Sequence, residues 1–260
     1  MAKFLDELRR EPLVGVQPHH PLALEGQVGH RPGKLLAVGR PGPLHHRTSP
    51  LAGQLERLVV GKTPRAVVLD LIEAAQARQE PEFRQALAAY DKTITPADQL
   101  AHYSVALEGG DPRKGQAVFF SSAETACQRC HRIKSPTGES QGGEVGPDLS
   151  GVGTRLAGEA LLESIVVPNK TIAQGFESVV LSTSDGKVHT GVLRGEDEKS
   201  VRLITAEGVS ETVAKDAIED RKRGPSAMPA DLAGKLGKRE LRDLIAFLTE
   251  LRAKDAAPSP

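Results

Sequence analysis

The chain has 260 residues, and its 34 lysine and arginine side chains balance its 34 aspartate and glutamate side chains. This balance leaves no net field to attract nucleic acid or an anionic membrane surface, and no apolar run approaches the length of a membrane span. Aromatic residues make up only 3% of the chain, with no tryptophan, which is little apolar bulk for one or two folded domains. The composition therefore excludes nucleic-acid-binding and membrane-spanning proteins.

The first 60 residues differ in composition from the rest of the chain. Proline, glycine, histidine and arginine are scattered without periodicity through residues 16–50, so we interpret 1–60 as a disordered or non-native segment. The pairs His19-His20 and His45-His46 lack converging partners and predict no metal site. The N-terminus also lacks the charged start, apolar core and cleavage site of a secretory signal.

Residues 61–108 predict a helical segment of the kind found in HEAT-like repeats. Thr63-Pro64 starts one helix, and a second begins at Pro81. The apolar stripes of the two helices are Val67, Val68, Leu71, Ile72 and Ala75 in the first, and Phe83, Leu87 and Tyr90 in the second. Because such helices bury too little surface alone, we expect them to dock on the rest of the chain or on a missing partner.

A further helix begins near residue 112 and leads to a cysteine motif. Asp111 is its expected cap, with Pro112 at the first helical position. The motif that follows contains the chain's two cysteines, in the run Cys127-Gln128-Arg129-Cys130-His131. This C-x-x-C-H spacing is the attachment signature of a covalently bound haem, with the histidine as an axial ligand of the iron. The motif therefore predicts one haem c, held by Cys127, Cys130 and His131.

Three other interpretations of the cysteine motif remain. A structural zinc site needs four ligands, and the other histidines form no second pair at suitable spacing. A thioredoxin-like redox pair belongs at a strand-to-helix turn, whereas polar loop follows here. A disulfide between residues three apart closes a loop too small to constrain the unfolded chain much, and it leaves His131 unexplained.

Between about 176 and 220 the sequence changes to β character. Four short runs carry the pattern of strands: 176–182, 187–193, 200–205 and 209–214. Asp185-Gly186 between the first two predicts a hairpin turn. We expect a small twisted antiparallel sheet or barrel beside the haem-binding helices.

The methionine that follows the β segment is a candidate sixth ligand. Met228 is the chain's only methionine besides Met1, and it lies 97 residues after His131. Pro229 biases Met228 toward extended backbone, which suits a stiff segment that holds a thioether over a haem face. The competing interpretation is a methionine that fills a gap in the core. The last predicted helix then spans 238–251, with apolar residues at i, i+3, i+4 and i+7.

These residues resemble the cytochrome c family. Gly115 and Phe119 stand where family members cross the first helix against the last, and Gly146-Pro147-Asp148-Leu149 resembles the family's G-P-x-L loop. The resemblance implies that the Pro147 carbonyl accepts the free N–H of the axial histidine and that Leu149 packs on the haem. A hydrogen bond of this kind would set the tautomer of His131 and raise its basicity.

Over about 109–253 the chain resembles one member of that family, the haem-binding domain of Pirellula/Verrucomicrobium type. The resemblance rests on Pro168-Asn169-Lys170, the β insert and Ser226-Ala227-Met228-Pro229 in combination. It implies a C-terminal cytochrome module of long exported chains, after a dehydrogenase-type propeller and HEAT-like helices. Because haem attachment in this family follows export and no signal is visible, we expect a periplasmic or otherwise exported protein and interpret the chain as truncated or wrongly started.

The expected fold is mainly α: a cytochrome c-like helical haem domain over 109–255 with a small antiparallel β insert at about 176–220, preceded by HEAT-like helices. The expected function is single-electron transfer by a c-type cytochrome with His131 and Met228 as axial ligands, which is an electron carrier and not an enzyme. We expect its partner to be a redox protein or a fused dehydrogenase domain. A haem-based sensor or peroxidase-like protein, and a non-redox interaction module, are the alternatives.

Overall fold

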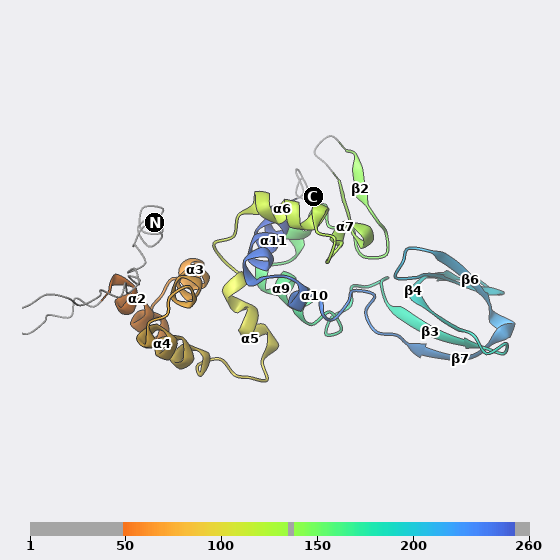
Figure 1. Ribbon diagram of the computed structural model, residues 1–260. Helices are drawn as coiled ribbons and strands as arrows, with labels where there is room; N and C mark the ends of the chain where they lie inside the picture. Colours follow the sequence, from red (N-terminus) through yellow and green to blue (C-terminus); the bar gives the residue numbers. More distant parts are fainter. Residues whose placement is uncertain (1–48, 135–137, 253–260) are drawn as a thin grey trace, which may run out of the picture.

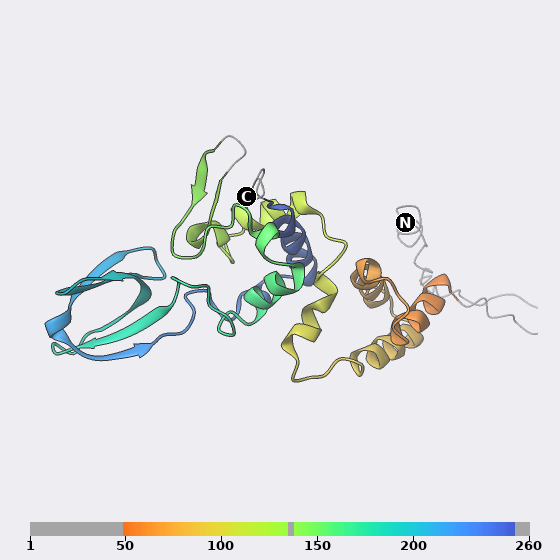
Figure 2. The same cartoon turned by 180° about the vertical axis from the view of Figure 1, so that it is seen from behind.

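The computed structural model describes residues 49–134 and 138–252. They form three parts in a row: N-terminal helices, a central lobe built around α6 and α11, and a five-stranded sheet at the opposite end (Figure 1). The view from behind shows the same order, with the sheet connected to the lobe by two chain segments (Figure 2).

The N-terminal helices are α2 (Pro50–Val59), α3 (Arg65–Gln76) and α4 (Pro81–Asp91). They enclose a core of their own, in which Leu51, Leu55 and Phe83 are almost fully buried. Helix α2 begins inside the segment for which we expected no regular structure, whereas residues 1–48, with both histidine pairs, lie outside the described residues. Pro81 starts α4 as predicted.

An ion-pair cluster joins these helices to the central lobe, as the docking argument expected. Asp70 on α3 accepts hydrogen bonds from Arg239 and Arg242, each at 2.8 Å, and Glu73 pairs with Arg239. Burial opposes the ionisation of Asp70, but the two guanidinium groups outweigh it and hold the pKa of the carboxyl below its usual range. Arg242 is only 4% exposed, so Asp70 supplies the charge that a buried guanidinium requires.

The central lobe consists of short helices and one small hairpin. Its helices are α5 (Gln99–Tyr103), η1 (Ser104–Ala106), α6 (Pro112–Ser121), α7 (Cys127–Cys130), α8 (Val152–Arg155), α9 (Gly158–Val166), α10 (Leu232–Lys235) and α11 (Lys238–Glu250), and its hairpin is β1 (Arg132–Lys134) with β2 (Ser140–Gly142). The Asp111 side chain caps α6 by accepting from the backbone N–H of Arg113 at 3.0 Å, as predicted.

Helices α6 and α11 of the lobe cross in close contact. A Cβ atom added at Gly115 would lie 1.9 Å from the carbonyl oxygen of Asp243 and 2.8 Å from the Cβ of Phe247, so only glycine fits there. Phe119 is buried one turn further along α6 and packs against Phe247 with ring centroids 5.9 Å apart. The two helices therefore cross at Gly115 and Phe119, the positions that the resemblance implied.

The sheet contains five antiparallel strands in the order β6-β5-β4-β3-β7. The strands are β3 (Ser178–Thr183), β4 (Val188–Glu196), β5 (Ser200–Ile204), β6 (Ser210–Ala214) and β7 (Ile218–Arg223), and η2 (Lys215–Ala217) precedes the last of them. The predicted hairpin between β3 and β4 is confirmed, with Gly186 at φ 81° in its turn. Val179, Leu181, Val201, Leu203 and Val213 form the core of the sheet.

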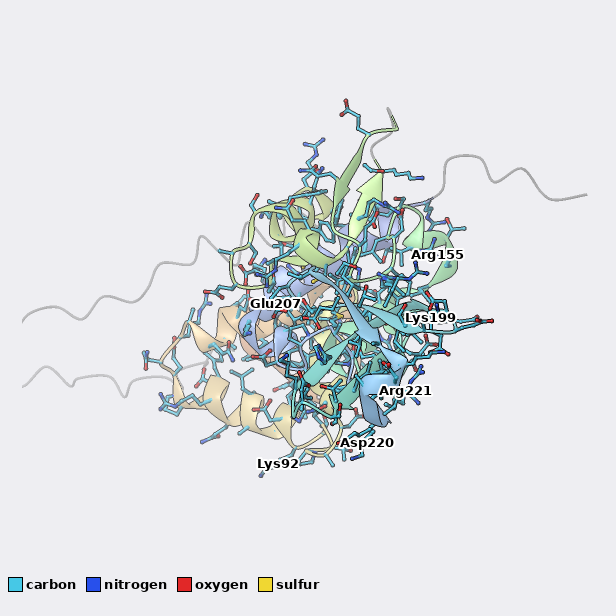
Figure 3. The ribbon with its side chains drawn as sticks, turned by 90° about the vertical axis from the view of Figure 1, so that its right-hand side faces the viewer. Lys92, Arg155, Lys199, Glu207, Asp220 and Arg221 are labelled. Atoms are coloured by element: carbon cyan, nitrogen blue, oxygen red, sulfur yellow. The ribbon has the colours of Figure 1, made fainter. Side chains whose placement is uncertain are left out.

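The prediction of a mainly α fold is wrong. Of the described residues, 44% are helical and 18% lie in strands, which makes the protein a mixed α and β structure with two sheets. The strand that we missed, β7, follows the predicted insert and pairs with β3. It reads Ile-Glu-Asp-Arg-Lys-Arg and lies on the outer edge of the sheet, so no apolar alternation marks it in the sequence. Figure 3 looks onto this end of the molecule, where Asp220 and Arg221 are labelled.

We expect the Gly115→Ala variant to lose about 2 kcal/mol or more of unfolding free energy, because the added methyl group would overlap backbone atoms of α11. Urea denaturation of the purified protein measures this loss. The matched control is Gly53→Ala on α2, where nothing lies within 4 Å of an added Cβ and helix propensity favours alanine. Equal midpoints for the two variants would contradict the close crossing.

Candidate functional site

A cavity of about 410 Å³ opens in the central lobe beside the cysteine turn. Its wall is mostly apolar and comes from helices α6 to α11, the segments 145–149 and 168–173, and the segment around Met228. All six predicted site residues line it: Cys127, Cys130, His131, Pro147, Leu149 and Met228. Tertiary structure therefore unites residues from three separate stretches of the chain, as the prediction of a single site requires.

The two cysteines lie on a single helical turn, α7, and both are free thiols. Residue 126, which precedes the turn, is an alanine in the left-handed conformation (φ 44°, ψ 41°), a strained backbone for a residue with a Cβ. The Cys127 thiol donates to Thr125 Oγ1 at 3.7 Å. Burial raises the pKa of both thiols, so at neutral pH each sulfur keeps its proton.

The His131 imidazole is held in one tautomer by the backbone of the loop opposite. Its Nδ1 lies 2.9 Å from the carbonyl oxygen of Pro147. Because a carbonyl only accepts hydrogen bonds, Nδ1 carries the proton and Nε2 keeps a free lone pair. Burial lowers the pKa of His131 despite the opposing effect of this hydrogen bond, so the ring is neutral at neutral pH. A neutral imidazole with a free Nε2 is a metal ligand.

The loop that carries Pro147 is folded tightly around the cysteine turn. The backbone N–H of Gly143 donates to Gln128, that of Gly146 to Cys130, and that of Leu149 to Arg132, each at 2.8 Å. A Cβ at Gly146 would lie 2.4 Å from Cε1 of His131, so this glycine lets the loop pass against the ring. The loop therefore fixes both the position and the orientation of His131.

Met228 lies on the connection between strand β7 and helix α10, partly buried against the main core of the lobe. Its backbone N–H donates to the Ser226 hydroxyl at 3.2 Å. The side chain lines the same cavity as the imidazole, although no element of secondary structure carries it there. Its place at the cavity is what we expected of a second ligand, and it also touches the core, as the gap-filling interpretation requires.

The sheet also contributes to the site, which sequence analysis did not predict. Val192 on β4 and Phe176, two residues before β3, line the cavity, and Arg194 on β4 lies over the Phe176 ring at 4.7 Å from its centroid. Arg194 also donates to the carbonyl oxygen of Glu144, next to the loop that holds His131. We had assigned Phe176 to the start of a strand, and no local pattern distinguished it from the other apolar residues of the insert.

Arg155 is the charged residue in the cavity wall, and its position was not predicted either. It lies at the end of α8 and donates to the carbonyl oxygen of Asp148 at 2.8 Å. Among the described residues that line the cavity, the Arg155 guanidinium is the one cationic group on an otherwise apolar or uncharged wall. Arg155 is labelled in Figure 3.

Within the described parts of the chain, no cluster of three or more His, Cys, Asp and Glu side chains could hold a metal ion. This finding concerns sites built from protein donors alone, such as the zinc site considered above. It does not bear on the predicted haem, because the porphyrin itself supplies four of the iron ligands. No helix of these same residues is both long enough and apolar enough to cross a membrane.

Comparison of the chain with models of protein families finds no match, and a search of curated proteins finds none either. The resemblance to the cytochrome c family therefore rests on the motifs and on the residues described above.

We expect the Gly146→Ala variant to displace the imidazole, since the new methyl group would overlap Cε1. Burial now lowers the His131 pKa, so a ring pushed toward solvent should titrate closer to the ordinary value of about 6.5. A pH titration of the ring protons by NMR, on protein without cofactor, measures the change. Gly234→Ala, with open space around its Cβ, should leave the titration of wild type unchanged.

Proposed function

We propose that this chain is a c-type cytochrome module that transfers single electrons through one covalently bound haem. The observation that supports it best is the convergence of both thiols, a neutral imidazole and a thioether on one apolar cavity. These groups are the donor set that a haem c with His/Met ligation requires, so the residues present fit the cofactor.

When bound, the haem iron takes up and releases one electron, cycling between its ferric and ferrous states. Cys127 and Cys130 would hold it covalently: each thiol adds across a vinyl group, with sulfur bonding one carbon and the thiol hydrogen going to the other. Both cysteines lie on one turn, and each keeps its thiol proton at neutral pH. The attachment needs no leaving group.

In this proposal His131 and Met228 would be the two protein ligands of the iron. Pro147 orients the imidazole and, by accepting its Nδ1–H, raises the basicity of the free Nε2. Met228 would supply a neutral thioether, which favours the reduced state and raises the potential relative to ligation by two histidines. Leu149, Phe176 and the other apolar residues of the wall would exclude water from a haem bound there.

Arg155 suits the polar edge of a haem. The cofactor carries two carboxylates, and a guanidinium in an otherwise uncharged wall would neutralise one of them. The same contact would fix which end of the cavity takes the carboxylates. The electron donor in this proposal is a redox protein or a fused dehydrogenase domain, and the module acts after export, in the periplasm or its equivalent, where haem attachment takes place in the family it resembles.

Covalent attachment provides the direct test. The chain is expressed behind an added export signal together with a cytochrome maturation system, and a denaturing gel is stained for haem. We expect the stain to comigrate with the wild-type chain and to disappear when Cys127 and Cys130 are both changed to serine. Wild-type protein that is matured and exported but carries no stain would overturn the proposed function.

The Met228→Ala variant tests the sixth ligand. Removing the thioether should leave that position available, so the affinity for added imidazole should rise about tenfold or more, equivalent to about 1.4 kcal/mol. Spectroscopic titration of the ferric protein measures it. Met228→His restores a strong ligand, so its affinity for added imidazole should stay low. Its reduction potential should be lower than that of wild type. Rapid ligand binding by the wild type would favour a sensor or peroxidase instead.

A further inference from the structure

We infer that Asn169 is a positioning residue for Met228: its side-chain oxygen holds the ligand segment, residues 224–229, against the wall of the cavity. This inference rests on the proposed function, because it concerns the ligation of the same haem. From the sequence, Asn169 stood out only as part of the run Pro168-Asn169-Lys170.

Two hydrogen bonds hold the ligand segment, one to the sheet and one to the central lobe. Where it leaves the sheet, the backbone N–H of Gly224 donates to the carbonyl oxygen of Ser178 on β3 at 2.8 Å. Two residues later, the backbone N–H of Ser226 donates to Asn169 Oδ1, also at 2.8 Å, although the two residues lie 57 positions apart. The first contact continues the sheet, whereas the second comes from a side chain of the central lobe.

Asn169 is itself held in place. It belongs to a turn that follows α9, in which the backbone N–H of Lys170 donates to the carbonyl oxygen of Val167 at 2.9 Å. The Lys170 ammonium group also pairs with Glu163 on α9. On either side of Asn169, Pro168 and Thr171 line the cavity. The Asn169 amide oxygen is therefore held by a segment that itself forms part of the cavity wall.

Two local interactions connect the Asn169–Ser226 hydrogen bond to Met228. The Ser226 hydroxyl accepts from the Met228 N–H at 3.2 Å, two residues further along. Pro229 restricts the backbone of Met228 from the other side. Asn169 thus fixes the start of a stiff four-residue stretch whose third member is the ligand. Asparagine occurs nowhere else in the 260 residues.

A ligand held in its bound position competes better with external ligands, because it loses less conformational freedom on binding. Losing one ordinary hydrogen bond of this kind should weaken that preorganisation by a factor of about three to ten. The expected effect is therefore easier displacement of Met228, without loss of the haem or of the fold.

The test uses the matured holoprotein and four variants. Asn169→Ala removes the acceptor, Asn169→Asp keeps an acceptor of the same shape, and Ser226→Ala breaks the next link. Asp197→Ala is the matched control, since Asp197 also accepts backbone N–H groups, from Lys199 and Ser200, in an exposed turn of the sheet. Ferric protein is titrated with imidazole while the absorption band of thioether-ligated haem is followed.

We expect Asn169→Ala and Ser226→Ala to bind imidazole about three- to tenfold more tightly than wild type. Asn169→Asp and Asp197→Ala should stay within about twofold of it, because neither removes the link to Met228. Amide exchange at Ser226, followed by NMR in the ferrous protein, should accelerate in Asn169→Ala and not in Asp197→Ala. This second measurement reports the hydrogen bond independently of ligand displacement.

The possible failures are distinguishable. A wild-type spectrum without the thioether band would overturn Met228 as ligand and this inference with it. A wild type that shows the band, together with an Asn169→Ala variant that matches it in imidazole affinity, would overturn the positioning role alone. Equal weakening in Asp197→Ala would show a general loss of stability and would likewise overturn it.

Discussion

The close crossing of α6 and α11 is the contact on which the rest of the structure depends. It needs a residue without a side chain at Gly115, because the carbonyl of Asp243 occupies the space that a Cβ would take. Around it gather the buried residues of the lobe, including Phe119, Leu244 and Leu248, and these three also line the cavity. The contact between these two helices thus forms part of the core of the lobe and part of the cavity wall. The ion pairs of Arg239 and Arg242 with Asp70 then attach the N-terminal helices to α11.

The site itself is a set of groups held by backbone. Pro147 holds His131 through a carbonyl, and the loop that carries Pro147 is held in turn by N–H groups that donate to the cysteine turn. Backbone partners of this kind do not titrate, so the neutrality of His131 follows from burial alone. The Met228 half of the site is held in the opposite way. In our proposal a side chain, that of Asn169, holds the backbone of the ligand segment. The two halves of the site differ in how much a single substitution can loosen them.

The sheet belongs to the site as well as to the fold. Phe176 and Val192 form part of the cavity wall, and Arg194 bridges from β4 to the loop near His131. The ligand segment begins where β7 ends, so the position of the sheet helps to place Met228 at the cavity. An expectation of a small insert in a mainly α domain understated this role. The strand that was missed carries five charged residues after Ile218, and hydrophobic periodicity cannot reveal a strand in which only one side chain is apolar.

The sequence by itself determined several features, because each depends on residues that are close together in the chain. The C-x-x-C-H spacing, the cap at Asp111, the apolar stripe of α11 and the hairpin turn before β4 all depend on residues within a few positions of each other. The candidate residues at the cavity were named on the same basis. Only the tertiary structure decided that β7 joins the sheet, that Phe176 and Arg155 enter the wall, and that Asn169 meets Ser226 across 57 residues. These contacts join distant segments, and their partners are chosen by packing of the whole chain, which no local pattern records.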